Sequence, residues 1–267
     1  MDEIVETKRA EVAAAKAQRP IEAVQAAAEQ ADPPRDFLKA VVGSGLRVAV
    51  IAEIKKASPS AGLIVRDFDP AGIARIYADH GAAAISVLTD RRYFQGDPSS
   101  IEVVKHATPL PALRKDFIVE AYQVFQSRAL GADAILLIAE VLGRDGVAEL
   151  LPIAQRLGMT ALIEVHEECS LDAVLDAVGS PAEGGYLLGF NNRDLKVQKT
   201  DLATTSRLAD RLEKRSGERG PFIAESGIAT PDDVRAVREA GACGILVGES
   251  LLRSDDIGGK LDELRDA

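Results

Sequence analysis

Acidic and basic side chains follow an apolar run near residue 50, where they could act together in proton transfer. Residues 48–54 (VAVIAEI) are largely apolar and β-branched, which is typical of a strand buried on both faces. Because side chains alternate along a strand, Glu53 and Lys55 project from the same face. Burying these two charges is costly unless they are paired or used in chemistry. We interpret them as functional groups; the alternative is a structural salt bridge at a strand end.

Polar residues also follow several later apolar runs. They are Lys115, Glu164, Asn191, the segment Glu225-Ser226-Gly227 and the segment Gly248-Glu249-Ser250. In a barrel of parallel strands, the carboxyl ends of all strands meet at one face, where such enzymes place their active sites. Acids and bases gathered in this way suit general acid–base chemistry. The sequence therefore predicts one site built from many strand ends.

Small residues near the last two of these runs predict a phosphate site. Ser226-Gly227 and Gly248-Glu249 offer backbone N–H groups at the place where such barrels bind phosphate. Ser58, in the loop beside Lys55, could close this site from the first strand. Glu249 would take part through its backbone N–H only, because its carboxylate would repel a phosphate. The alternative is that the glycines merely allow tight turns.

Alternating strand and helix segments must position these residues. Strands are predicted at 48–54, 84–88, 111–114, 134–138, 160–165, 186–190, 221–224 and 244–247. Helices are predicted at 70–80, 98–107, 121–130, 147–157, 170–178, 201–212, from 230 onward and at 257–265. We predict an α/β fold: a single (β/α)8 TIM barrel over 47–267, with an N-terminal helical extension over 1–46 packed on the barrel. A doubly wound open sheet would need fewer strands and an early glycine fingerprint, which is missing.

Composition limits the class of protein. The 267 residues carry a net charge of −10, which argues against nonspecific nucleic-acid binding. No apolar run approaches the roughly 18 residues of a membrane span, and the N-terminus lacks signal-peptide features, so we expect a cytoplasmic protein with no membrane partner. Zinc-type spacing of His and Cys is missing, and we expect no metal and no cofactor. Of the histidines, His80 and His106 are expected on helices and His166 in a loop.

Several segments of the chain are informative when taken together. They are 51–60 (IAEIKKASPS), 86–90 (SVLTD), 93–96 (YFQG), 113–118 (LRKDFI), 162–165 (LIEV), 189–195 (GFNNRDL) and 225–228 (ESGI). In combination they resemble the indole-3-glycerol-phosphate synthase family, the ring-closing enzymes of tryptophan biosynthesis, and the resemblance covers essentially the whole chain. Phe190 and Ala224 depart from the family's usual Ile and Ser, at positions that are not polar catalytic ones.

The resemblance implies a carboxy-lyase that converts 1-(2-carboxyphenylamino)-1-deoxyribulose 5-phosphate to indole-3-glycerol phosphate, with loss of CO2 and water. Lys115 matches the family's general acid, which would protonate the substrate ketone and benefit from a lowered pKa. Glu53 would stabilise the cationic intermediate. Glu164 and Lys55 would share the acid and base roles of the dehydration, in an order that the sequence leaves open.

The same resemblance implies the groups that bind the substrate. Asn191 and Arg193 would orient its carboxylate or hydroxyls, and Ser226 and Glu225 stand in the matching segment after the seventh strand. An apolar wall around the anthranilate ring would come from Phe94, Phe117 and Leu195, although core packing is an equal reading of Phe117. We expect a monomer that takes a small phosphorylated substrate, and leave open an association with other enzymes of the tryptophan pathway.

Three other functions stay open at this point. A phosphoribosylanthranilate isomerase would have a Cys in place of Glu53. A Schiff-base aldolase would use Lys115 as a nucleophile. A non-catalytic phosphate-binding barrel would have no reason to keep Glu53, Lys55, Lys115 and Glu164 together.

Overall fold

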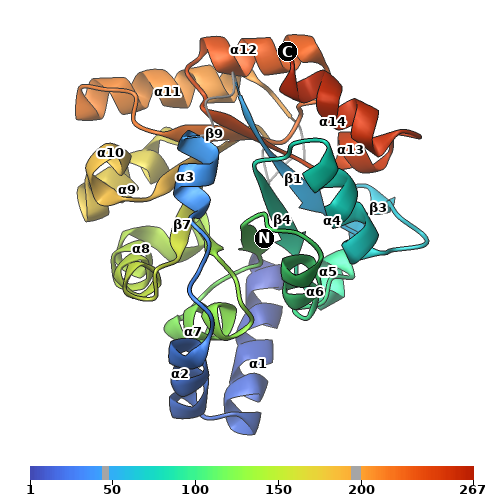
Figure 1. Ribbon diagram of the computed structural model, residues 1–267. Coiled ribbons are helices and arrows are strands. Elements are labelled where there is room, and N and C mark those ends of the chain that lie inside the picture. The colour runs from blue at the N-terminus through green and yellow to red at the C-terminus, as the bar shows by residue number, and fades with distance from the viewer. Residues whose placement is uncertain (44–47, 194–199) are drawn as a thin grey trace.

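The computed structural model describes residues 1–43, 48–193 and 200–267, and these form a closed parallel barrel surrounded by helices (Figure 1). The strand order around the barrel is β1-β10-β9-β8-β7-β6-β5-β4. The strands are β1 (Ala49–Ile54), β4 (Ala84–Leu88), β5 (Ala112–Lys115), β6 (Ala134–Ile138), β7 (Thr160–Val165), β8 (Leu187–Asn191), β9 (Phe222–Glu225) and β10 (Gly244–Val247). The predicted (β/α)8 barrel is confirmed.

Helices cover the outside of the barrel, and several begin at residues that cap them. The Asp69 carboxylate accepts a hydrogen bond from the Ala71 N–H, and Thr230 and Asp233 form a reciprocal capping box. In the described part of the chain, no helix is both long and apolar enough to cross a membrane. The helices that follow barrel strands are α4 (Pro70–Asp79), α6 (Ser100–Ala107), α7 (Ala121–Ala129), α8 (Ala139–Arg156), α9 (Glu168–Val178), α11 (Ala203–Ser216), α12 (Pro231–Glu239) and α14 (Ile257–Arg265).

Some elements differ from the sequence prediction. Helix α8 begins at Ala139, well before the predicted 147, and its first turn is set off by the left-handed Gly143 (φ 62°). A hairpin and three one-turn helices were not predicted, because two to four residues are too few to show a period. They are β2 (Ala57–Ser58), β3 (Gly62–Leu63), α5 (Arg91–Phe94), α10 (Pro181–Gly184) and α13 (Glu249–Leu252).

Three helices precede the first barrel strand: α1 (Asp2–Gln18), α2 (Ile21–Gln30) and α3 (Phe37–Val42). Helices α1 and α2 lie together beside α7, at the bottom of Figure 1. Helix α3 instead contacts β1 and β4. Its side chains Phe37 and Val41 are fully buried among the inward-facing residues of the strands. Helix α3 therefore contributes to the packing of the barrel interior.

Alternate residues of each strand fill the interior of the barrel. Ala49, Ile51, Leu113, Leu136, Leu162, Leu187, Ile223 and Leu246 form one apolar cluster there, while their neighbours pack outward against the helices. The two-residue period continues to the carboxyl ends of the strands. The next inward position is charged on four strands, where it is Glu53, Lys115, Glu164 or Glu225. Asn191 ends β8 on the same face, whereas Ile138 keeps the inward position of β6 apolar. The fold thus places a charged layer directly above an apolar one.

Candidate active site

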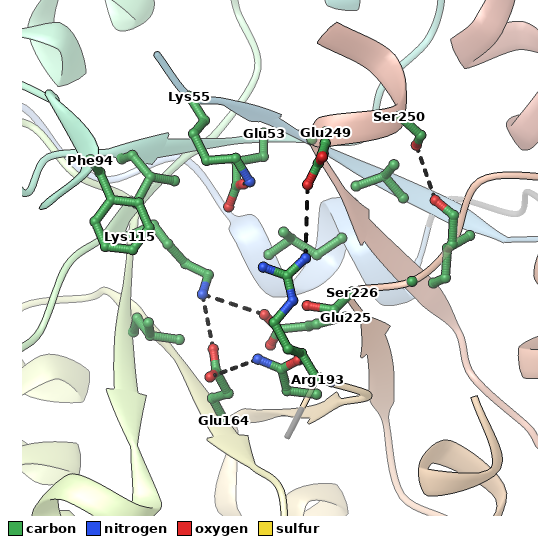
Figure 2. Close-up of a pocket in the computed structure, with 18 of the residues that line it drawn as sticks. Glu53, Lys55, Phe94, Lys115, Glu164, Arg193, Glu225, Ser226, Glu249 and Ser250 are labelled. Atoms are coloured by element: carbon green, nitrogen blue, oxygen red, sulfur yellow. Dashed lines mark hydrogen bonds and ion pairs between the residues drawn. The ribbon is translucent and has the colours of Figure 1, made fainter. Parts of the chain in front are cut away.

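A cavity of about 440 Å³ opens above this charged layer (Figure 2), a volume that suits a small organic ligand. Two of the predicted site residues are not among those that line it. Leu195 lies outside the described residues. The Ser58 hydroxyl accepts a hydrogen bond from the Ala61 N–H within the β2–β3 turn. The predicted residues that do line the cavity are Glu53, Lys55, Phe94, Lys115, Phe117, Glu164, Asn191, Arg193, Glu225, Ser226, Gly227, Gly248 and Glu249.

The Lys115 ammonium lies between two buried carboxylates (Figure 2). Its Nζ is 2.9 Å from Glu164 Oε2 and 3.5 Å from Glu225 Oε2. The three residues come from β5, β7 and β9, so only the closed barrel brings them together. A buried ammonium needs such partners, because burial without them would strongly favour the neutral amine.

These carboxylates decide the protonation state of Lys115. Burial alone would lower its pKa, but Glu164, Glu225 and Glu53 together outweigh burial and raise the pKa well above the ordinary 10.5. The expectation of a lowered pKa for this lysine is therefore wrong. It considered burial and a neighbouring cation, whereas the nearest charged groups are anions. Lys115 stays protonated throughout the neutral range.

The two carboxylates around Lys115 differ from each other. Burial would raise the pKa of Glu164, but the Lys115 and His166 cations and a hydrogen bond from Asn191 Nδ2 (3.0 Å) lower it. Glu225 is also buried, lies beside the negative Glu164, and has an Oε1 without a hydrogen-bond partner among the described residues. Its pKa is raised by burial and by Glu164. The site therefore offers a carboxylate and a carboxylic acid on either side of one ammonium.

Glu53 and Lys55 form a second ion pair on the cavity wall. Lys55 Nζ lies 2.6 Å from Glu53 Oε1, and both side chains are largely buried. Gly248 lies against Glu53, so closely that any Cβ at this position would clash with the Glu53 side chain. The pair is thus a salt bridge and at the same time part of the cavity lining. The position of this pair is therefore compatible with both interpretations of the sequence, a pair of functional groups and a structural salt bridge.

The wall near β9 and β10 is rich in cationic and backbone N–H groups. Arg193 donates to Ser60 Oγ at 2.9 Å, and its Nη2 lies 3.8 Å from the Glu249 carboxylate. Arg253, which the sequence interpretation missed although it stands three residues after Ser250, also holds Glu249 and lines the cavity. Ser226 and Gly227 are both left-handed (φ 66° and 77°). A non-glycine residue held in this conformation costs about 1–3 kcal/mol and often marks a functional turn.

Aromatic side chains form the opposite wall. The rings of Phe94 and Phe117 have centroids 6.3 Å apart and are tilted by 38°. Phe94 is positioned by the one-turn helix α5, whose N-terminus is capped by Asp90 through the Tyr93 N–H at 2.8 Å. Leu88 and Ile138 also line the cavity. An aromatic ligand fits this wall better than a sugar does.

Two further groups near the site are buried, and the sequence interpretation gave neither of them a role in it. His166 lies in the loop directly after β7, as expected, but it is only 9% exposed, and its Nε2 lies 3.4 Å from Glu164 Oε1. Its position two residues beyond Glu164 could have indicated this contact, because side chains two apart share a face. Lys8 of α1 is 4% exposed, and its Nζ lies 2.9 Å from both Asp90 and Asp116. Nothing in the local pattern around Lys8 indicates this burial.

Comparison with known proteins agrees with the geometry. A sequence model of the family "Indole-3-glycerol phosphate synthase" matches residues 1–264. Proteins of that name from Chromobacterium violaceum and Laribacter hongkongensis are each 47% identical over 266 residues, which is 99% of this chain and 97% and 98% of theirs. The Roseiflexus sp. (strain RS-1) protein of the same name is 45% identical over 270 residues, 99% of this chain and 97% of its own.

Solved structures support the fold alone. The tryptophan synthase subunit alpha from Legionella pneumophila matches with a TM-score of 0.60 and 14% identity, over 86% of this chain and 96% of that one. The thiamine phosphate pyrophosphorylase from Pyrococcus furiosus has a TM-score of 0.53 and 15% identity, over 82% and 94%. With the family match over almost its full length and relatives at 47% identity, this chain belongs to the indole-3-glycerol phosphate synthase family.

Proposed function

We propose that this protein converts 1-(2-carboxyphenylamino)-1-deoxyribulose 5-phosphate to indole-3-glycerol phosphate, releasing CO2 and water, in tryptophan biosynthesis. The observation that carries the proposal is the Lys115 ammonium between Glu164 and Glu225, at the floor of a cavity with an aromatic wall and a cationic one. Membership of the family supports the same reaction. The barrel over 47–267 is the catalytic part, and residues 1–46 are an extension of it.

Ring closure requires the substrate ketone to become electrophilic. Lys115 is the donor toward the ketone oxygen, because its raised pKa keeps it charged at neutral pH. Glu225, whose raised pKa favours the protonated acid, is the nearby group that restores a proton passed on by Lys115. Attack by the aromatic carbon leaves a cation on the ring system. The Glu53 carboxylate, on the adjacent wall, stabilises that charge.

Decarboxylation then returns the ring electrons, and dehydration completes the indole. Removing water needs an acid for the leaving hydroxyl and a base for a ring proton. The lowered pKa of Glu164 favours its base form, which makes Lys55 the acid. Asn191 donates to Glu164 and accepts from the Arg193 N–H at 3.0 Å, so it fixes the orientation of the base. Ser226 lies beside them as a hydrogen-bonding group for the substrate.

The two cavity walls give the substrate a direction. Its phosphate binds near Gly227, Gly248 and the backbone of Glu249, with Arg193 and Arg253 supplying positive charge. The anthranilate ring packs against Phe94 and Phe117. Action as a monomer is part of the proposal, and association with other tryptophan-pathway enzymes is left as an extension of it. A phosphorylated substrate cannot readily leave a membrane-bounded compartment, and we place the reaction in the cytoplasm.

The protonation of Lys115 argues against a Schiff-base aldolase. A nucleophilic lysine must be neutral to attack a carbonyl, and such lysines are desolvated or lie near other cations. Lys115 is surrounded by carboxylates, which hold its proton. Borohydride treatment in the presence of substrate therefore leaves the protein mass unchanged under our proposal. A trapped adduct would favour the aldolase instead.

The direct test is to supply the carboxyphenylamino-deoxyribulose phosphate to the purified protein. We expect indole fluorescence to appear together with one CO2 for each product molecule formed. The catalytic variant Lys115→Met serves as the background control. Binding of the substrate without any indole would indicate a non-catalytic phosphate-binding barrel and would overturn the proposal.

A further inference from the structure

His166 lies behind the proposed catalytic base, on the side away from the cavity. Its Nδ1 is 3.0 Å from Glu140 Oε2, and its backbone N–H donates to Glu140 Oε1 at 2.8 Å. Its other ring nitrogen, Nε2, lies 3.4 Å from Glu164 Oε1. His166 is not among the residues that line the cavity. Glu140, His166 and Glu164 therefore form a row that leads away from the cavity.

The other end of this row is open to water. The Glu140 side chain is 17% exposed, against 8% for His166 and 3% for Glu164. Glu140 also borders a second hollow of about 250 Å³, which is lined by Val141 and by Met1, Asp2, Val5, Glu6 and Arg9 of the N-terminal segment. This hollow is separate from the cavity that would hold the substrate. A proton can reach the row from solvent while the cavity is occupied.

The hydrogen bonding of the His166 ring leaves one position undefined. Glu140 holds His166 through its backbone N–H and its ring Nδ1, so Nδ1 carries a proton toward Glu140. Nε2 is buried and has no hydrogen-bond partner among the described residues, although it points toward the Glu164 carboxylate. A lone pair on Nε2 would face the lone pairs of that carboxylate. One proton between the two atoms removes this repulsion.

We propose that His166 and Glu164 share one proton, and that Glu140 holds His166 in place for this purpose. His166 is thus a positioning residue that acts through Glu164. In one state, an imidazolium faces a carboxylate. In the other state the Nε2–H bond has broken, an Oε1–H bond has formed, and a neutral imidazole faces a carboxylic acid. The two opposite charges cancel in this transfer, so no other reactant is needed.

The surrounding charges agree with a protonated His166. The groups that face it are Glu140 from α8, Glu164 from β7, Glu225 from β9 and, beyond Glu164, Lys115 from β5. Burial would lower the pKa of His166, but the carboxylates of Glu140, Glu164 and Glu225 raise it above the ordinary 6.5. Near Glu140, Asp2, Glu6 and Arg9 of α1 add further charges at the solvent end.

The shared proton can serve the proposed reaction, and this part of the inference rests on the proposed function. The substrate carboxylate leaves as neutral CO2, so each turnover takes up one proton. The substrate covers the cavity at that stage. His166 passes the proton to Glu164 from behind, and Glu164 passes it on to Lys115 and Glu225, whose nearest atoms are 2.9 and 3.5 Å apart along this path. Glu164 is then ionised again for its role as base, and the row is recharged from solvent through the Glu140 side.

The first test measures the histidine directly and needs no substrate. The chain has only three histidines, so ring ¹⁵N NMR gives three separate titrations. We expect the midpoint of His166 to fall by about one pH unit or more in Glu164→Gln and in Glu140→Gln, as expected for loss of one opposite charge. Asp262→Asn is the control, because it removes a carboxylate that lies 2.7 Å from His80 instead, and it should leave the His166 midpoint unchanged. If the titration midpoint of His166 is the same in Glu164→Gln as in the wild type, the proposal is wrong.

The second test separates an effect on catalysis from an effect on packing. We expect His166→Gln to lower kcat by about tenfold, the equivalent of one pKa unit, with KM unchanged because His166 does not line the cavity. As a single variant, Glu140→Gln should lower kcat. In a double variant with His166→Gln, it should cause no further loss of kcat. An additional loss in the double variant would mean that Glu140 acts independently and would contradict the row. A wild-type protein without ring-closing activity would refute the proposed function, and the NMR titration would still decide the inference.

Discussion

The charged layer of the cavity contains more buried carboxylates than lysines. Glu53, Glu164 and Glu225 face Lys55 and Lys115, which leaves one negative charge without a partner of its own in this set. Glu225 is the carboxylate with a buried, unpartnered oxygen, and its pKa is the one that rises. A proton on Glu225 restores the balance. The protonation of each group is therefore a property of the set and not of one residue.

Lys115 is the residue whose loss should affect catalysis most. In Lys115→Met, the ketone loses its donor, so kcat should fall by at least about 10²-fold, the size typical of lost general acid catalysis. Indole fluorescence under saturating substrate measures this. Thermal unfolding of the same variant checks that the protein remains folded. A near-normal kcat would remove Lys115 from the mechanism.

Glu225 gives a prediction for stability against pH. Its pKa is higher in the folded protein than the ordinary 4.5, so the folded state binds the extra proton. This contribution to stability is present below about pH 4.5 and is lost as the pH rises through the raised pKa. Glutamine does not titrate, so the variant Glu225→Gln does not lose stability in this way as the pH rises. We expect its Tm to rise relative to the wild type between about pH 5 and about pH 9.

The opposite dependence of stability on pH is expected for Glu164, because its pKa is lowered in the folded protein. Its contribution is present above about pH 4.5 and is lost as the pH falls. In Glu164→Gln, the deficit in Tm should therefore shrink in acid. If the Tm of Glu225→Gln and that of Glu164→Gln each differ from the wild-type Tm by the same amount at every pH, the two carboxylates do not have the shifted pKa values described above.

Among the secondary-structure elements, the strands were predicted best from the sequence. Most barrel strands are largely apolar runs of four to six residues, although β5 (ALRK) has only two apolar residues. The two-residue period predicted that Glu53 and Lys55 share one face. The one-turn helices α5 and α13 were not predicted, although they carry Phe94 and Glu249. Their conformation depends on tertiary contacts, such as Ser250 Oγ donating to the Ile228 carbonyl at 3.0 Å.

The turn after β9 allows a test of the phosphate wall. Gly227 is left-handed, and a Cβ there would also clash with Thr200. In Gly227→Val, we expect KM to rise by more than kcat falls, because the side chain would distort the backbone that binds phosphate. Steady-state kinetics measures both constants.

Gly217 provides the control for this variant. It is also left-handed (φ 79°), and it lies at the end of α11 with no atom near the position of its Cβ. Gly217→Val introduces the same backbone strain away from the cavity, so KM should stay unchanged while Tm falls. An unchanged KM in Gly227→Val would place the phosphate elsewhere.

At the scale of the whole molecule, Lys8 joins the N-terminal helices to the barrel. It contacts Asp116, the neighbour of Lys115, and Asp90, which caps the helix of Phe94. Arg114 and Thr89 bond to the other oxygen of Asp116, so this network continues under the rim of the cavity. Burial would lower the pKa of Lys8, but the carboxylates of Asp116, Asp90 and Glu11 raise it above its usual range.

Removing this buried cation should destabilise the protein strongly. Lys8→Met leaves Asp90 and Asp116 without it, and loss of one partner in a buried pair costs about 3–5 kcal/mol. Lys16→Met is the control on the same helix, because the Lys16–Glu120 pair is exposed and worth at most about 1 kcal/mol. Denaturant unfolding measures both. Equal losses in the two variants would contradict the role of Lys8.

The site as a whole was more predictable than its surroundings. Convergence of Lys115, Glu164 and Glu225 follows from the barrel closure, which the alternation of elements predicted. Lys8 was not predictable, because a lysine on a charged helix reads as a surface residue. Its burial depends on partners far away in the chain. His166 lay between these cases: its face was predictable, but its contact with Glu140 depended on the unpredicted first turn of α8.

The position of Lys8 also bears on how the chain acquires its shape during synthesis. A ribosome makes this lysine near the beginning, yet Asp116 follows more than a hundred positions later. Helix α1 is therefore synthesised well before β5 and the carboxylate that Lys8 contacts in the folded protein. The partners of Lys115 on β7 and β9 are made later still, so the rim around Lys115 can be completed only after most of the chain has been synthesised.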